Sequence, residues 1–327
     1  MLNRQATRGL AGATSFFAGL AVSAAAMAAS GHPVPNQLGL QEPATQVMES
    51  IVAFHDAVTV VITVIAIFVG LLMAYAMWRF SAGNNPTPSK NTHNTMLEVA
   101  WTVLPILILL GIAVPSFKLL YLEYTYPKPD VTIKATGNAW FWEHEYPDLG
   151  GVKVTSNMIT DEDVVKDEIG KAEFDKRFGK LDGLDRLKQI HEASTPLWAK
   201  TKQIRQLSVD NEIAVPVNKV VHLLVTSNDV IHSWTIPSFG SKTQAVPGRI
   251  TTTWFKPTRI GVYYGQCSVL CGKAHSGMPI AIRVVSELAF TDWLAAAKAK
   301  DWKKAKIILA AATDGIDQPQ YAEAAPR

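Results

Sequence analysis

Two long runs with almost no charged residues constrain the fold of this 327-residue chain more than any other feature. Residues 57–77 contain no charged side chain, and residues 99–122 contain one, Lys118, near the end of the run. An α-helix rises about 1.5 Å per residue, so about twenty apolar residues cross the hydrocarbon core of a membrane. The two runs therefore predict a transmembrane helix hairpin within residues 51–125.

Charged residues beside the two runs predict the orientation of the hairpin. Arg79 and Lys90 lie in the loop between the runs, whereas Glu49, Asp56 and Glu123 lie at the opposite ends. Cytoplasmic loops of membrane proteins are enriched in Lys and Arg, so we expect this loop in the cytoplasm. Both chain termini are then expected outside the cytoplasm.

The N-terminal residues 1–28 are expected to form a secretory signal peptide. Arg4 and Arg8 give a positive start, residues 10–27 are mostly small and apolar, and an Ala-Met-Ala cleavage site ends the run. The alternative is a third membrane span. Cleavage would leave residues 29–50 as an extracytoplasmic segment before the hairpin, in agreement with the predicted orientation.

The residues after the hairpin, 126–287, predict an all-β domain. Short segments of alternating polarity, beginning with residues 131–136, are joined by Gly and Pro turns and favour a Greek-key sandwich of the cupredoxin type. A region with nearly balanced charges and helix-favouring stretches, at about 150–200, predicts a surface insertion. Residues 288–327 are expected to form a C-terminal helix, over 288–306, and a tail. The predicted fold class is thus mixed, a helix hairpin followed by a β domain.

Both cysteines of the chain lie in one short segment that also carries a histidine and a methionine. Cys267, Cys271, His275 and Met278 have the spacing Cys-x3-Cys-x3-His-x2-Met. Thiolate and thioether ligands select copper, zinc or iron–sulfur centres, and imidazole suits copper and zinc. A preceding strand can bring His232 beside this segment. Two bridging thiolates, one imidazole per metal and a weak axial ligand on each would hold two copper ions for one-electron transfer.

Two simpler interpretations use the same residues. Two cysteines outside the cytoplasm commonly form a disulfide. The spacing of Cys267 and Cys271 also suits a Cys2His2 zinc site. Neither interpretation explains Met278.

Several motifs in the second half of the chain resemble subunit II of the haem–copper cytochrome c oxidases, and the resemblance extends to the membrane hairpin. The motifs are His232-Ser233-Trp234, Ala245-Val246-Pro247-Gly248-Arg249, Tyr263-Tyr264-Gly265-Gln266-Cys267-Ser268, Cys271-Gly272, His275 and Met278-Pro279-Ile280. The resemblance implies six ligands for a binuclear CuA centre, namely the bridging thiolates of Cys267 and Cys271, the imidazoles of His232 and His275, the axial thioether of Met278 and the backbone carbonyl of Val269.

One departure from the family concerns a second metal. The family usually has Glu where this chain has Val269, and there the carboxylate helps to hold magnesium at the contact with subunit I. Valine keeps the backbone carbonyl and lacks the carboxylate. We therefore expect an intact copper site and a weakened or missing magnesium site.

The resemblance also implies roles for two residues outside residues 267–278, here called the copper segment or copper loop. Trp140 begins an aromatic run, 140–146, and stands where electrons enter in the family. Ala139, Phe141 and His144 differ from the residues usual there. Glu98 stands where the family has the mouth of a proton pathway that runs through subunit I. Acidic residues around the copper end are expected to steer a basic cytochrome c. The candidates are Glu143, Glu145, Asp148, Asp210 and Asp229.

The expected function follows from this resemblance. The chain would be a subunit, beside subunits I and III, of an oxidase in the lipid of a bacterial inner membrane, with the copper domain in the periplasm. It would pass electrons from cytochrome c through CuA to haem a of subunit I, where dioxygen is reduced to water and protons are pumped. A net charge of +3 gives no reason to expect a nucleic-acid partner.

Three other classes of protein fit the sequence less well than this function. Quinol oxidase subunits II lack the copper ligands that this chain carries. A tethered copper-delivery protein would need an open site that releases its metal. The copper domain of nitrous oxide reductase accompanies a much longer catalytic domain and has no membrane hairpin.

Overall fold

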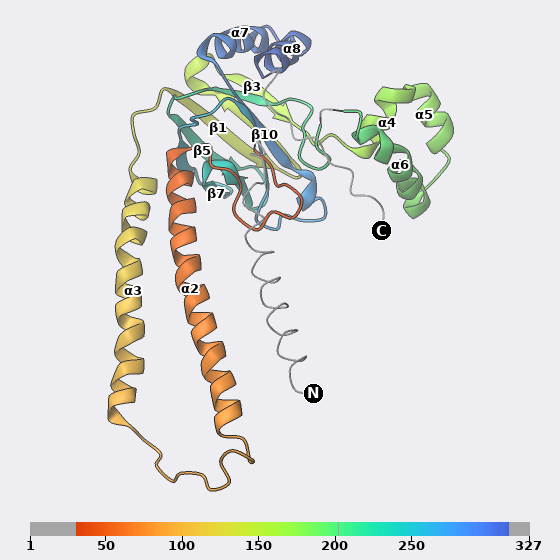
Figure 1. Cartoon of the computed structure of the whole chain (residues 1–327). Helices are drawn as coiled ribbons and strands as arrows, with labels where there is room; N and C mark the ends of the chain where they lie inside the picture. Colours follow the sequence, from red (N-terminus) through yellow and green to blue (C-terminus); the bar gives the residue numbers. More distant parts are fainter. Residues whose placement is uncertain (1–30, 202, 314–327) are drawn as a thin grey trace.

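The fold of this chain is described by a computed structural model over residues 31–201 and 203–313. Two long helices, α2 (Gln46–Arg79) and α3 (Thr95–Tyr124), run side by side away from a β domain and are joined at their far ends by a loop (Figure 1). Both are long and apolar enough to cross a membrane. The predicted helix hairpin is therefore confirmed, while the expected signal peptide, 1–28, lies outside the described residues.

Polar caps make both helices longer than their apolar runs. The Thr45 hydroxyl accepts a hydrogen bond from the backbone N–H of Met48 at the start of α2. The Asn94 side chain likewise accepts from Met96 and Leu97 at the start of α3. Such caps satisfy N–H groups that have no partner within the helix, so each helix begins at the cap and not at the first apolar residue.

The β domain contains ten strands in three sheets. A five-stranded sheet has the order β3-β2-β1-β5-β8, a three-stranded sheet has the order β4-β10-β9, and β6 pairs with β7. β1 pairs in parallel with β5, and β4 pairs in parallel with β10. Strands far apart in the sequence are therefore hydrogen-bonded to each other. The strands are β1 (Val131–Asn138), β2 (Phe141–Tyr146), β3 (Val152–Ser156), β4 (Ile213–Pro216), β5 (Val221–Ser227), β6 (His232–Ile236), β7 (Ser241–Ala245), β8 (Thr251–Phe255), β9 (Gly261–Gln266) and β10 (Pro279–Val285).

One core joins these sheets, and the copper segment belongs to it. Residues of β5 alternate between buried and half-buried positions, as expected for a strand with one face on a core. Trp142 and Trp234 are among the largest fully buried side chains. Cys267, Cys271 and Met278 are part of the same apolar cluster. The predicted β domain is confirmed, and its packing determines where the cysteines lie.

A small helical unit projects from one side of the β domain (Figure 1). It consists of α4 (Asp161–Ile169), α5 (Lys171–Phe178) and α6 (Gly183–Trp198), with its own apolar cluster that includes Phe174 and Phe178. The sequence placed the start of this insertion at about residue 150. The structure has β3 at Val152–Ser156, where alternate residues are buried, and a short helix, η2 (Pro147–Leu149), before it. The helical insertion therefore begins after Ser156.

The C-terminal region forms two helices where a single helix over 288–306 was expected. α7 (Glu287–Lys298) and α8 (Trp302–Ala312) lie at the end of the β domain away from the hairpin (Figure 1). The backbone of Lys300 has a φ of 57°, a left-handed conformation that ends α7. The Asp301 side chain then accepts a hydrogen bond from Lys304 N and caps α8.

Hydrogen bonds attach the β domain to both membrane helices. The Thr45 hydroxyl donates to the carbonyl of Phe239 at 2.8 Å, in the short helix η3 (Pro237–Phe239). Trp254 Nε1 donates to the carbonyl of Glu123, near the end of α3, at 3.0 Å. The entry and exit of the hairpin are therefore both held by β-domain residues.

Candidate metal centre

The copper segment connects two paired strands and is held against a third. Gln266, at the end of β9, pairs with Pro279, at the start of β10, so the twelve residues between them form a closed loop. A Cβ on Gly265 would lie 1.7 Å from the carbonyl oxygen of Thr235 in β6. Glycine is therefore required for β9 to approach β6, and this approach brings the loop beside His232, the first residue of β6.

Two cysteines and one histidine form the centre of the site. The sulfur atoms of Cys267 and Cys271 lie 3.8 Å apart, and His232 Nδ1 lies 4.0 Å from the Cys267 sulfur. The ligand atoms of all three residues lie within 4.8 Å of one another. Both thiols are free, so the disulfide alternative is not observed.

Three further groups surround the two sulfurs. His275, in the short helix η4 (His275–Gly277), places Nδ1 3.5 Å from the Cys271 sulfur, and the Met278 sulfur lies 3.5 Å from the same atom. The backbone carbonyl oxygen of Val269 lies 3.3 Å from the Cys267 sulfur. The structure thus brings together all six residues named from the sequence, with one imidazole and one weaker donor on each side of the sulfur pair.

The chemistry of this donor set fits copper. Burial and the neighbouring Cys267 raise the pKa of the Cys271 thiol to about 12. Two thiolates so close in an apolar setting would repel each other and lack solvation unless a cation lay between them. A bound metal ion deprotonates such thiols outright. Thiolate, imidazole and thioether together suit copper, whereas zinc sites use cysteine, histidine and carboxylate.

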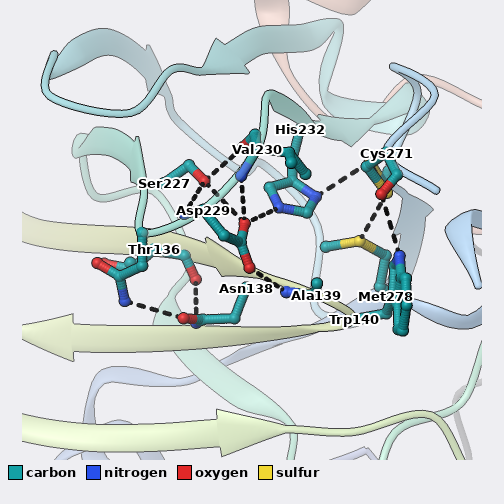
Figure 2. A network of polar contacts seen from close by, with 12 residues as sticks. Thr136, Asn138, Ala139, Trp140, Ser227, Asp229, Val230, His232, Cys271 and Met278 are labelled. Atoms are coloured by element: carbon teal, nitrogen blue, oxygen red, sulfur yellow. Dashed lines mark hydrogen bonds and ion pairs between the residues drawn. The ribbon is translucent and has the colours of Figure 1, made fainter.

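The His232 ring is confined on every side that the structure describes. A Cβ on Gly137 would lie 2.7 Å from His232 Cδ2, and the Trp142 ring meets the imidazole edge-on with 6.0 Å between centroids. His232 Nε2 lies 2.8 Å from Asp229 Oδ1 (Figure 2). The ring is fully buried, so these contacts fix its orientation and direct Nδ1 toward Cys267.

Trp140 lies directly on the copper loop. Its Nε1 donates a hydrogen bond to the carbonyl of Cys271 at 3.1 Å (Figure 2). A Cβ on Gly272 would lie 3.1 Å from the indole, and the backbone of Gly272 has a φ of 119°. The ammonium of Lys273 lies 5.6 Å from the centre of the ring. Trp140 is thus in contact with the loop and half-exposed to solvent.

Strand β2, which follows Trp140, also contacts the copper loop. Trp142 Nε1 donates to the carbonyl of Met278 at 3.3 Å. His144, one of the departures from the family pattern, is fully buried and accepts a hydrogen bond from Trp234 Nε1 at 3.3 Å. Burial lowers the pKa of His144 to about 3, so the ring is neutral and belongs to the core.

Glu98 is not part of this cluster. It lies in the first turn of α3, at the end of the hairpin farthest from the β domain (Figure 1). Its carboxylate accepts a hydrogen bond from the backbone N–H of Asn94 at 3.2 Å.

Sequence reasoning did not single out three residues that shape the site. Gly137 and Trp142 were not named as functional residues, and Asp229 was considered only as an acid that steers cytochrome c. A glycine within a strand often marks a close approach by another group, and this signal could have found Gly137. No sequence pattern reveals that the Asp229 carboxylate turns inward.

Comparisons with known proteins identify the family of the chain. The family description "Cytochrome C oxidase subunit II, transmembrane domain" matches residues 33–119, and "Cytochrome C oxidase subunit II, periplasmic domain" matches residues 131–180 and 194–285. The chain belongs to the cytochrome c oxidase subunit II family. The gap in the match lies in the helical insertion, the part of the β domain that departs most from a continuous sandwich.

Curated relatives and a solved structure are similar over long stretches. Cytochrome c oxidase subunit 2 of Cereibacter sphaeroides is 38% identical, over 91% of this chain and 95% of the relative. A probable cytochrome c oxidase subunit 2 of Rickettsia bellii is 41% identical, over 80% of this chain and 85% of the relative. The crystal structure of the periplasmic domain of subunit II (CoxB) of Bradyrhizobium japonicum is 42% identical and covers 54% of this chain and 99% of that one, with a TM-score of 0.41.

Membership in this family establishes the broad role of the chain. It is a subunit of a terminal oxidase complex, a membrane protein with a periplasmic domain, and its His232, Cys267 and Cys271 cluster is a candidate copper site.

We expect Gly137→Ala to weaken copper binding. The added methyl group would collide with the His232 ring, which is buried and cannot move into solvent. Displacing a ligand ring in this way is expected to reduce copper affinity by about 10- to 100-fold, as for loss of a group that orients a metal ligand. The measurement is copper per chain after dialysis of the detergent-purified protein against a competing chelator.

Gly277→Ala is the matched control because this glycine lies in the copper loop itself. A Cβ there would meet its nearest atom at 3.6 Å, an ordinary contact. Equal copper retention by the two alanine variants would contradict the role assigned to Gly137.

Proposed function

We propose that this subunit holds a binuclear CuA centre and accepts electrons from cytochrome c on behalf of its oxidase. The observation that carries the proposal is the pair of sulfurs 3.8 Å apart with one imidazole beside each. When bound, two coppers bridged by such thiolates share one electron and release it with little change in their surroundings. Cys267 and Cys271 would bridge the metals, and His232 and His275 would each bind one.

The two weaker donors complete this ligand set. The thioether of Met278 lies on the Cys271 side and the carbonyl of Val269 lies on the Cys267 side. Because Gln266 and Pro279, which flank the loop, pair with each other, the donors would keep their places whether or not an electron is present. A rigid donor set of this kind supports repeated one-electron transfer. It disfavours the release of metal that a delivery protein would require.

Electrons are proposed to enter at Trp140 and leave toward haem a of subunit I. Trp140 is half-exposed and donates its indole N–H to the carbonyl of Cys271, so it joins the protein surface to a copper ligand by one hydrogen bond. Subunit I would then reduce dioxygen to water and, with subunit III beside it, couple this reaction to proton pumping. Glu98 would admit protons at the opposite end of the hairpin.

We also propose the membrane arrangement and the processing of the chain. Residues 1–28 would be removed as a signal peptide, 29–50 and the domain over 126–287 would lie in the periplasm, and the loop between α2 and α3 would lie in the cytoplasm of a bacterium, so that residues 51–125 span its inner membrane. Residues 288–327 would follow on the periplasmic side. Arg79 and Lys90 near the loop support this orientation.

We expect the detergent-purified full chain, loaded with copper, to contain two copper ions. Its electron paramagnetic resonance spectrum should show hyperfine splitting from both copper nuclei, because the bridging thiolates share one unpaired electron between them. One copper per chain, or a preference for zinc, would contradict the proposal and favour a tethered copper-handling protein. Cys271→Ser is the control, since it removes one bridge and should abolish the shared splitting.

The same metal analysis, applied to the purified oxidase, bears on the magnesium proposal. Val269 supplies only its backbone carbonyl, so the complex is expected to contain less than one magnesium ion per copper pair. Stoichiometric magnesium would show that other groups replace the missing carboxylate.

Trp140→Phe is expected to slow reduction of the subunit by cytochrome c while copper is retained. Phenylalanine can still pack on Gly272 but has no N–H to donate to the Cys271 carbonyl. A loss of about one to two orders of magnitude is expected, as when a reacting group loses its alignment. The measurement is the stopped-flow rate of copper reduction, with Trp302→Phe at the far end of the domain as the control. An unchanged rate would remove Trp140 from the path.

Glu98→Ala is expected to have the opposite pattern. Oxidase turnover should fall by about tenfold or more, since a group that transfers protons is lost. Reduction of copper by cytochrome c should stay at the wild-type rate because Glu98 lies at the far end of α3. Glu49→Ala, at the other end of the hairpin, is the control with the same change in charge. Normal turnover in the Glu98 variant would rule out its role in proton uptake.

A further inference from the structure

We propose that Asp229 is a positioning residue that holds both His232 and Trp140 in place at the copper site. This inference rests on the proposed function of that site. The sequence offered Asp229 only as one of five acids that could attract a basic cytochrome. Its carboxylate in the structure faces the copper ligands, with about one third of the side chain exposed, 35%.

The two oxygens of Asp229 contact two different parts of the site. Oδ1 lies 2.8 Å from Nε2 of His232. Oδ2 accepts a hydrogen bond from the backbone N–H of Ala139 at 2.6 Å. Figure 2 shows the carboxylate between the His232 ring on one side and the turn that carries Ala139 and Trp140 on the other.

The Asp229 carboxylate is itself held by its own turn. The backbone N–H of Val230 donates to Oδ1 at 2.6 Å, and the Ser227 hydroxyl accepts from the backbone N–H of Asp229 at 3.2 Å. Asn228, between Ser227 and Asp229, donates a hydrogen bond from its side-chain amide to the Asn138 side-chain oxygen at 2.8 Å. These contacts attach the turn to the end of β1, so the carboxylate has little freedom to follow a displaced ligand.

The first contact determines which nitrogen of His232 is available to metal. A carboxylate only accepts hydrogen bonds, so Nε2 carries the proton and Nδ1 keeps its lone pair. That lone pair faces the Cys267 sulfur, 4.0 Å away. A carboxylate behind a ligating histidine fixes the tautomer and the ring orientation and raises the basicity of the ligand. His232 is fully buried, and Asp229 lies between its Nε2 and the protein surface.

The second contact extends the same control to Trp140. Ala139 precedes Trp140, so Oδ2 fixes the backbone from which the indole reaches the loop. Trp140 in turn donates to the carbonyl of Cys271. One carboxylate is therefore connected to Cys267 through His232 and to Cys271 through Trp140. The sulfur atoms of these two cysteines lie 3.8 Å apart.

This arrangement predicts a graded response to substitution. Asparagine has nearly the same shape as aspartate, but only one of its two terminal atoms accepts a hydrogen bond. In Asp229→Asn the side chain can therefore accept a hydrogen bond from His232 or from Ala139, but not from both. Its N–H₂ group then faces the other donor. Asp229→Ala removes both acceptors. Defects at the copper site should increase from wild type to the asparagine variant and then to the alanine variant.

Asp148→Asn is the matched control for lost charge. Asp148 is exposed and was another candidate for steering cytochrome c. It carries the same charge as Asp229 but follows the last residue of β2, whereas Asp229 contacts Ala139 just before the first residue of β2. The contacts of the copper ligands described above do not include Asp148. If Asp229 acted only through its charge, added salt would mask the effect of Asp229→Asn, as it would mask any effect of Asp148→Asn.

The experiment uses the purified oxidase with wild-type subunit II, Asp229→Asn, Asp229→Ala or Asp148→Asn. We expect copper in the Asp229→Asn protein to be lost to a competing chelator about 10- to 100-fold more readily than in wild type, with a larger loss for alanine. The copper hyperfine splitting should change in both Asp229 variants and stay unchanged in Asp148→Asn. At high salt, reduction by cytochrome c should be slower than in wild type only in the Asp229 variants.

Two results would overturn the proposal. The first is wild-type copper retention and an unchanged spectrum in Asp229→Asn. The second is loss of the fold in that variant, by circular dichroism, because the role would then be general and not local to the copper ligands. Failure of the wild-type oxidase to show two coppers would instead overturn the proposed function, so the two failures are distinguishable.

Discussion

The site depends on backbone pairing between β9 and β10, which meet at Gln266 and Pro279. This pairing closes the connecting loop so tightly that two cysteines four residues apart bring their sulfurs to 3.8 Å. An open loop would let the thiols separate and be solvated, and the raised pKa of the Cys271 thiol would return toward the usual range for cysteine. The closed loop instead keeps them buried and close, an arrangement that a bridging metal cation stabilises better than any neutral side chain could.

Features that depend on local sequence were predicted correctly. The helix hairpin follows from uncharged runs long enough to cross a membrane, since a helix satisfies every backbone polar group of such a run within the run itself. The β domain follows from alternation and from Gly and Pro turns. The donors Cys267, Cys271, His275 and Met278 lie within twelve residues, so their proximity needs only a loop. His232 is different, because its proximity depends on how β6 meets β9, and resemblance to a family supplied what spacing alone left open.

Features that depend on distant contacts were predicted less well. The strand Val152–Ser156 is short and was included in the insertion, although its pairing with β2 places it in the sheet. A single C-terminal helix was predicted, but the structure has two, separated by the left-handed backbone of Lys300. Helix propensity does not reveal this break. The inward turn of Asp229 depends on His232, which follows it by three residues, and on Ala139, ninety positions earlier. Sequence reasoning finds ligands more readily than the groups that orient them, because orientation comes from tertiary packing.

The contrast between the two halves of the chain explains what the hairpin contributes. The membrane-spanning windows of α2 and α3 have no buried residues within the described chain, so lipid and other subunits must cover them. The ends of the same helices are held to the β domain by Thr45 with Phe239 and by Trp254 with Glu123. Anchoring at both ends restricts rotation of the domain about either helix. A domain attached at two points to the membrane helices holds its copper loop in a fixed position relative to them, as the electron transfer proposed for this loop would require.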